Sequence, residues 1–150
     1  MPNIVYTETA PDKEAYLKLF ETTGWNQMYQ ASAEELDLGN RNSWYLVAAY
    51  DQDRLVGFGR VMCDGATHAM LYDMIVHPEY QNKGIGSAIL ERLVRKCQEH
   101  RIRDVQLFCA RGKQPFYEKH GFLPRPLDAP GMQLKQTGNK GGDSISREIS

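Results

Sequence analysis

One continuous segment restricts the fold more than any other, because a strand, a glycine loop and a helix follow one another directly. The run His68–Val76 predicts the strand, and Pro78 ends it because proline cannot donate to a strand ladder. A helix is predicted from Gly84 to about His100. It presents one apolar face at the helical period, made of Ile85, Ala88, Ile89, Leu93, Val94 and Cys97.

The strands around this segment predict a mixed sheet. The short apolar run Asp104–Cys109 follows the helix, and a strand–helix–strand unit of this length places its two strands parallel. Upstream, Trp44–Tyr50 and Leu55–Cys63 predict an antiparallel hairpin, and the alternating run Ile4–Glu8 predicts a first strand. A bulge or a close backbone approach is indicated inside the second hairpin strand by two glycines, Gly57 and Gly59.

Two short helices are predicted before the hairpin. The first opens at Pro11-Asp12 and runs to about Glu21. The second, Ala33–Leu38, begins with a capping box of Ser32 and Glu35 and is expected to break at Gly39-Asn40. The stretch Trp25–Ala31 between them is expected to be a loop.

The end of the chain completes the predicted order of elements. Gln114–Lys119 predicts a short helix that Gly121 ends. Phe122-Leu123 begins a further extended piece, with Met132–Lys135 as its candidate partner. The predicted order is β-α-α-β-β-β-α-β-α-β, which is an α+β, three-layer sandwich with a mixed sheet and helices on both faces. We expect a single domain over residues 1–135 and a flexible polar tail over residues 136–150.

Composition argues against several classes of function. The 150 residues carry a formal net charge of −1, which gives no support to sequence-independent nucleic-acid binding. No apolar run is long enough to span a membrane, and the first residues do not resemble a signal peptide, so we expect a cytoplasmic protein. Three widely spaced cysteines, Cys63, Cys97 and Cys109, predict buried free thiols rather than a disulfide framework or a metal site.

The glycine loop is a candidate anion site. The first turn of a helix leaves backbone N–H groups without internal partners, and the helix dipole adds positive potential there. Glycine lets a phosphate approach the backbone, so a pyrophosphate fits the amides of about Gln81 to Ser87, with Lys83 adding a charge. A tight turn before a helix is the alternative interpretation. The spacing matches neither a P-loop nor a Rossmann fingerprint.

The wider segment Val76-x-Pro78-x-x-Gln81-x-x-Gly84-x-Gly86 resembles the acetyl-CoA signature of the GCN5-related N-acetyltransferase (GNAT) superfamily, with glutamine at a position where arginine is commoner. The resemblance extends over about Trp44–Leu123. It implies acetyl-CoA as co-substrate without a metal, and a pantetheine arm paired with the strand backbone. The implied cofactor-binding residues are Met74, Ile75, Val76, Gln81, Asn82, Lys83, Gly84, Ile85, Gly86, Ser87, Phe116 and Lys119.

A second segment, Pro115–Phe122, is similar to the closing motif of the same superfamily. The resemblance implies that Tyr117 is the proton donor to the departing thiolate, a role that a hydroxyl within hydrogen-bond reach can fill. Core packing is the alternative for both Phe116 and Tyr117.

The general base is predicted from the residues of the strand. Alternation places Leu71, Asp73 and Ile75 on one face, and an acid inside an apolar strand needs a reason. We expect Asp73 to accept the proton of the attacking amine. A hydrogen bond from Asp73 to nearby backbone is the alternative, and His77, His120 or water are other candidate bases.

The acceptor is expected to be a small-molecule primary amine, bound by the N-terminal half of the chain. Its pocket includes the Trp25–Gln30 segment, and the candidate aromatic wall consists of Trp25, Met28, Tyr29, Tyr45 and Tyr72. A non-catalytic acyl-CoA sensor with the same fold is the alternative function. Relatives in the superfamily are often dimers, so a homodimer is left open. We expect neither a nucleic-acid nor a membrane partner.

Overall fold

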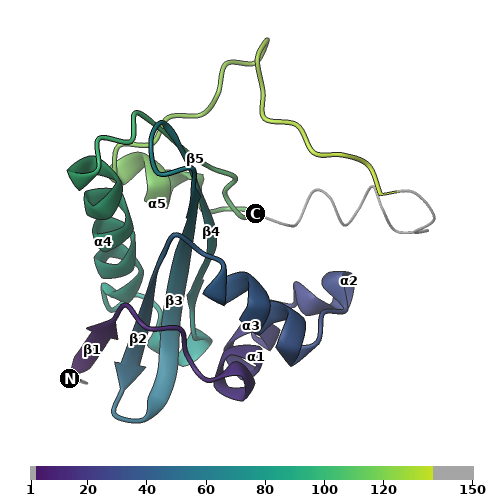
Figure 1. Cartoon of the computed structure of the whole chain (residues 1–150), viewed down its shortest axis with the longest axis vertical. Coiled ribbons are helices and arrows are strands. Elements are labelled where there is room, and N and C mark those ends of the chain that lie inside the picture. The colour runs from purple at the N-terminus through teal and green to yellow at the C-terminus, as the bar shows by residue number, and fades with distance from the viewer. Residues whose placement is uncertain (1–2, 137–150) are drawn as a thin grey trace. The chain divides into compact units, whose positions relative to one another are not determined.

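The computed structural model describes residues 3–136 (Figure 1). One compact unit extends to Gln106, and a second begins at Leu107. The single domain expected over residues 1–135 stays a prediction. The flexible tail was expected at 136–150, and residues 137–150 are outside the described part of the chain. In chain order the elements are β1 (Ile4–Thr7), α1 (Lys13–Glu21), α2 (Asn26–Tyr29), α3 (Ala33–Arg41), β2 (Tyr45–Asp51), β3 (Arg54–Cys63), β4 (His68–Val76), the 3-10 turn η1 (Pro78–Tyr80), α4 (Ile85–Glu99), β5 (Asp104–Leu107) and α5 (Gln114–Lys119).

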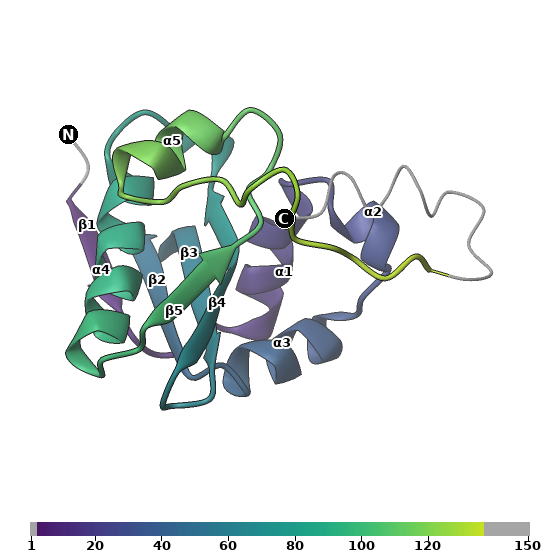
Figure 2. The ribbon, with the colours of Figure 1, turned by 90° about the horizontal axis from the view of Figure 1, so that it is seen from above.

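Five strands form one sheet in the order β1-β2-β3-β4-β5. The first four are antiparallel neighbours, so the predicted hairpin and the strands on either side of it are confirmed. Strand β5 follows helix α4 and lies beside β4, which completes the mixed sheet (Figure 2). It starts where the Asp104 N–H donates to the Thr67 carbonyl at 3.0 Å. It ends at Leu107, two residues earlier than predicted.

Helices cover both faces of the sheet, as predicted. On one face, the ring of Tyr16 in α1 meets the ring of Phe58 in β3 edge-on at 4.7 Å. On the other face lies α4 (Figure 1). A Cβ added to Gly59 would lie 2.7 Å from the Met74 sulfur and 2.9 Å from Ile89 of α4. The close approach predicted for this strand is therefore confirmed, since only glycine leaves room for α4 at this distance.

The N-terminal helices show one confirmed prediction and two corrections. The capping box forms, with the Glu35 N–H donating to Ser32 Oγ and the Ser32 N–H donating to the Glu35 carboxylate, both at 3.1 Å. The break expected at Gly39-Asn40 was wrong, because α3 continues to Arg41 with Asn40 buried. The loop expected at Trp25–Ala31 contains the short helix α2, because Trp25 and Tyr29 pack against Phe20 of α1.

The second unit contains helix α5 with the predicted bounds, followed by Gly121 at φ +92°. The last predicted strand, Phe122-Leu123 with Met132–Lys135, does not form in the described residues. Leu123 is 85% and Met132 86% exposed, so no apolar burial supports strand pairing there.

Candidate functional site

The loop between β4 and α4 has the backbone shape of an anion site. Gln81 Nε2 donates to the Val76 carbonyl at 3.1 Å and so ties the loop back to the end of β4. Asn82 and Gly84 then take positive φ angles of +63° and +84°. These two residues turn the chain sharply into α4. Gly84 is the N-cap residue of α4, and no side chain forms a capping hydrogen bond there. We call residues 81–87 the glycine cradle.

The glycine cradle offers unpaired donors at the start of α4. Ala88 is the first residue whose N–H bonds into the helix, to the Gly84 carbonyl at 3.0 Å. The N–H groups of Ile85, Gly86 and Ser87 in the first turn therefore lack intrahelical partners. A Cβ added to Gly84 would meet nothing within 4 Å, so open space lies in front of it. This combination fits a phosphate group.

A network outside the cradle holds η1 against the β2–β3 hairpin. The Tyr80 hydroxyl donates to the Asp51 carboxylate, and this bond is the main reason that the pKa of Tyr80 is raised. Arg54 forms an ion pair with Glu79 at 2.9 Å and lies 3.2 Å from His77 Nε2. His77 also caps η1 by accepting the Glu79 N–H at 3.1 Å, so it acts as a capping residue. Sequence reasoning missed Tyr80 and Asp51, which are 29 positions apart.

Strand β4 contains a bulge at the predicted base. Arg60 of β3 pairs with Tyr72, but Phe58 pairs with Ile75, so β4 has one more residue than β3 between these partners. Asp73 takes φ +56° there. The alternation expected for Leu71, Asp73 and Ile75 was therefore wrong, because the extra residue puts Tyr72 and Asp73 on the same face as Arg60.

An ion pair holds the Asp73 carboxylate. Arg60 Nε donates to Asp73 Oδ2 at 2.8 Å, and the two side chains are 19% and 13% exposed. The guanidinium is fixed further by the Gly39 carbonyl at 3.1 Å and Ser43 Oγ at 3.2 Å, and it lies over the Tyr72 ring. Asp73 thus binds an arginine rather than nearby backbone, and sequence reasoning missed Arg60.

Neutral phenols surround this ion pair. Burial, followed by the Asp73 carboxylate, raises the pKa of Tyr29 to about 12. Burial also raises the pKa of Tyr16 well above its ordinary value, with Asp73 as the next cause. Both hydroxyls therefore stay protonated near neutral pH, and they can donate hydrogen bonds but cannot act as bases.

The aromatic wall predicted for the acceptor is only partly assembled. Trp25 and Tyr29 lie together against Phe20, and Tyr72 lies under Arg60. Tyr45 does not belong with them. Its hydroxyl donates to Glu8 and its ring lies under Lys96 of α4, on the opposite face of the sheet.

Within residues 3–106, no strand pairs with the side of β4 away from β3 after the bulge. Strand β5 is four residues long and begins beside Thr67, so it pairs with the first half of β4 only. Met74, Ile75 and Val76 lie beyond that half, and β3 pairs with the other side of Ile75 and Val76. An open strand edge can accept an extended ligand that carries amide groups, in the manner of an added strand.

The predicted proton donor lies in the second unit. The Tyr117 ring contacts Phe116 edge-on at 5.1 Å and Phe122 at 6.1 Å. Burial, followed by the nearby Cys109, raises the pKa of Tyr117 to about 12, so the phenol is protonated near neutral pH. Lys119 is exposed at the end of the same helix. The approach of Tyr117, Phe116 and Lys119 to a bound thioester stays a prediction.

Further sequence-based expectations concern thiols, metal sites and membrane-spanning helices. All three cysteines are free, but Cys109 is exposed and Cys63 half-buried, so the expectation of burial holds for Cys97 alone. In residues 3–136, no group of three or more histidine, cysteine, aspartate or glutamate side chains is arranged to hold a metal ion. Over the same residues, none of the helices is both long and apolar enough to cross a bilayer.

Comparison with known proteins gives one consistent family. Residues 41–124 match the model of the acetyltransferase (GNAT) domain. The chain is 36% identical over 81 residues to GCN5-related N-acetyltransferase 2, chloroplastic, from Arabidopsis thaliana, and 35% identical over 82 residues to histone acetyltransferase TAP1 from Glycine max. These matches cover 54% and 55% of this chain and 31% and 36% of the relatives, so the chain spans about a third of each plant protein.

A solved structure is similar over nearly the whole chain. A "probable acetyltransferase" from meticillin-resistant Staphylococcus aureus is 31% identical, with a TM-score of 0.80. The match covers 89% of this chain and 100% of that one. The order of strands and helices around the glycine cradle is therefore a shared architecture.

Proposed function

This chain belongs to the acetyltransferase (GNAT) domain family, and on that premise we propose that it transfers acetyl from acetyl-CoA to a primary amine of a small-molecule acceptor, by direct attack in a ternary complex. The glycine cradle carries this proposal. Its unpaired N–H groups and the open space at Gly84 match the diphosphate of coenzyme A. The open edge at Met74–Val76 matches the amide-bearing pantetheine arm.

The remaining predicted contacts complete the binding site. Lys83 is exposed and lies 5.5 Å from the Tyr80 ring, where its charge can add to the cradle. Gln81 and Asn82 shape the loop, and Ser87 adds a hydroxyl to the first helical turn. When bound, acetyl-CoA supplies an activated thioester, and the chain supplies orientation and proton transfer.

The chain offers a candidate proton acceptor and a candidate proton donor for this reaction. The transfer forms a C–N bond and breaks a C–S bond, so the amine loses a proton and the sulfur gains one. Asp73 accepts the amine proton, directly or through water. Tyr117 is a protonated phenol and donates to the sulfur. Arg60 keeps the Asp73 carboxylate in place at the bulge.

The acceptor class is the finer part of the proposal. One relative is named a histone acetyltransferase, but its match to this chain covers 36% of its length. A small acceptor is favoured here by the cluster of Asp73, Arg60 and tyrosines, which is largely buried. The cytoplasmic location and the homodimer stay predictions.

The test is a thiol-release assay over a panel of small amines, run beside acetyl-CoA binding by calorimetry. We expect turnover with at least one amine and a loss of about 10²–10⁴-fold for Tyr117→Phe. Gly84→Ala should weaken acetyl-CoA binding, because alanine resists φ +84° at the cradle. Gly24→Ala is the matched control, since Gly24 has φ +80° and open space but lies far along the chain from the cradle.

Each negative result has a distinct meaning. Binding of acetyl-CoA without turnover on any amine would favour the non-catalytic sensor. An unchanged acetyl-CoA affinity in Gly84→Ala would show that the glycine cradle does not bind the co-substrate. An unchanged turnover rate in Tyr117→Phe would show that Tyr117 is not the proton donor.

A further inference from the structure

A shallow surface cavity of about 340 Å³, open to solvent, lies in the first unit, and none of residues 81–87 lines it. Its size is within the range of small-molecule sites. The end of β3, the turn after it and the starts of β4 and β5 form its walls, and the residues are Met62, Cys63, Asp64, His68, Ala69, Met70, Asp104 and Gln106. We call it the methionine cavity. None of the predicted site residues lines it.

The methionine cavity adjoins the Asp73–Arg60 ion pair. Met62 pairs with Met70 across β3 and β4, and its sulfur lies 3.4 Å from Arg60 Nη1. Met62 therefore lies on the face of the sheet that carries Arg60 and Asp73. Methionine side chains adapt to apolar ligands of varied shape.

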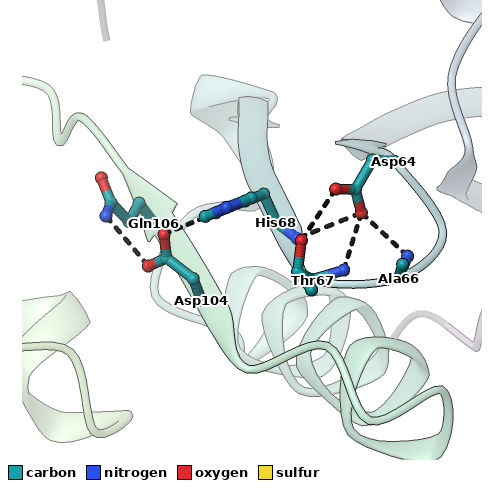
Figure 3. Close-up of polar contacts among 6 residues, drawn as sticks. All are labelled: Asp64, Ala66, Thr67, His68, Asp104 and Gln106. Atoms are coloured by element: carbon teal, nitrogen blue, oxygen red, sulfur yellow. Dashed lines mark hydrogen bonds and ion pairs between the residues drawn. The ribbon is translucent and has the colours of Figure 1, made fainter.

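The far end of the methionine cavity is acidic. Asp104 Oδ2 lies 2.8 Å from His68 Nδ1, and Asp104 Oδ1 accepts from Gln106 Nε2 at 2.9 Å (Figure 3). Asp64 accepts the N–H groups of Ala66, Thr67 and His68 and the Thr67 hydroxyl, as the figure also shows. Among residues 3–136, two carboxylates and no lysine or arginine line the cavity, so a cation is favoured there.

We propose that the methionine cavity binds the distal part of the acceptor, and that the favoured acceptor is a linear amine with an uncharged apolar spacer and a second cationic group at its far end. This inference rests on the proposed acetyl transfer. Tyr72 is four positions along β4 from His68, so the acceptor spans roughly 13 Å at about 3.3 Å per residue. Arg60 lies beside the path, and an ammonium in the middle of the acceptor would be repelled by it.

The experiment compares matched acceptors by kcat/KM. A series of linear diamines from diaminobutane to diaminododecane should show a clear optimum among the longer members. At that length, kcat/KM for the diamine should be about three- to tenfold higher than for the monoamine. This factor is expected for a hydrogen-bonded charge pair that is partly exposed. A triamine of equal length with a central nitrogen should be poorer than the diamine.

Asp104→Asn identifies the distal contact. It should abolish the preference for the diamine and leave kcat/KM for the monoamine within about twofold. Asp53→Asn is the matched control, because Asp53 is exposed in the β2–β3 turn at the opposite end of β3. Equal rates for diamine and monoamine, or an equal loss on both in Asp104→Asn, would overturn the proposal.

A second readout does not need turnover. Methyl-labelled methionine NMR during titration with the preferred diamine should shift the methyl signals of Met62 and Met70. The monoamine should shift them less, and Asp104→Asn should remove the difference. Shifts without turnover would refute the proposed enzyme and keep the binding site. Turnover without these shifts would refute the methionine cavity and keep the enzyme.

Discussion

The Asp73–Arg60 ion pair makes a quantitative prediction about stability. The perturbation is Arg60→Met, which keeps the apolar stem but removes the guanidinium. Asp73 is 13% exposed and loses its ion-pair partner, and the Gly39 carbonyl and Ser43 hydroxyl lose a donor. Breaking a buried ion pair costs about 3–5 kcal/mol. Because both side chains keep some contact with solvent, we expect Arg60→Met to lower the free energy of unfolding by about 2–3 kcal/mol.

A double-mutant cycle separates the pair from other losses. Asp73→Asn alone keeps an oxygen that can accept from Arg60 Nε, so it should cost about 1–2 kcal/mol. The double variant Arg60→Met/Asp73→Asn has no unpaired charge. It should therefore be more stable than the sum of the single losses predicts, by about 1–2 kcal/mol.

The assay is urea unfolding of the four proteins, with the free energy of unfolding extrapolated to water. Lys13→Met is the control, because the Lys13–Glu34 pair at 3.3 Å is exposed on both sides and its loss should be too small to resolve. Additivity of the two single variants within about 0.5 kcal/mol would refute the coupling and with it the anchoring of Asp73 by Arg60.

Two further predictions test the packing and the turn chemistry. Gly59→Ala should destabilise the chain by about 1–3 kcal/mol in the same urea assay, because its Cβ meets Met74 and α4 at 2.7–3.0 Å, and an unchanged midpoint would contradict that packing. The four hydrogen bonds to Asp64 lower its pKa far below the ordinary 3.8. Ionised Asp64 therefore stabilises the folded chain fully above about pH 3.8, and this stabilisation is lost as the pH falls through the lowered pKa. Acid unfolding of Asp64→Asn should accordingly be less steep than that of the native chain, and identical acid profiles would contradict the prediction.

Local signals in the sequence predicted most element boundaries. Strand β4 has the predicted bounds because Pro78 cannot continue the ladder, and α5 has them because Gly121 takes the left-handed conformation after it. The capping box at Ser32 is likewise a contact between residues three positions apart. Each of these signals acts within one turn of chain, so the sequence is sufficient to identify it.

Features that depend on distant contacts were not predictable in this way. The alternation in β2 does not tell which helix covers Tyr45, and that choice follows from the closure of the whole sheet. The same holds for the support of η1, where Tyr80 finds Asp51 across the hairpin. The glycine cradle could be predicted because its donors are backbone groups, whereas the methionine cavity needs three strands in register.

Two of the wrong predictions concern residues that bind the same guanidinium, that of Arg60. Helix α3 was expected to break at Gly39, and Asp73 was expected to follow the alternation of β4. In the fold, Arg60 binds the Gly39 carbonyl through Nη1 and the Asp73 carboxylate through Nε. A Cβ on Gly39 would lie 3.9 Å from the guanidinium, which is an ordinary van der Waals distance, so the helix and the guanidinium are in close contact there. The continued helix α3 and the bulge at Asp73 thus hold one charge beside a carboxylate, and the proposed role of Asp73 as proton acceptor would give this arrangement a function.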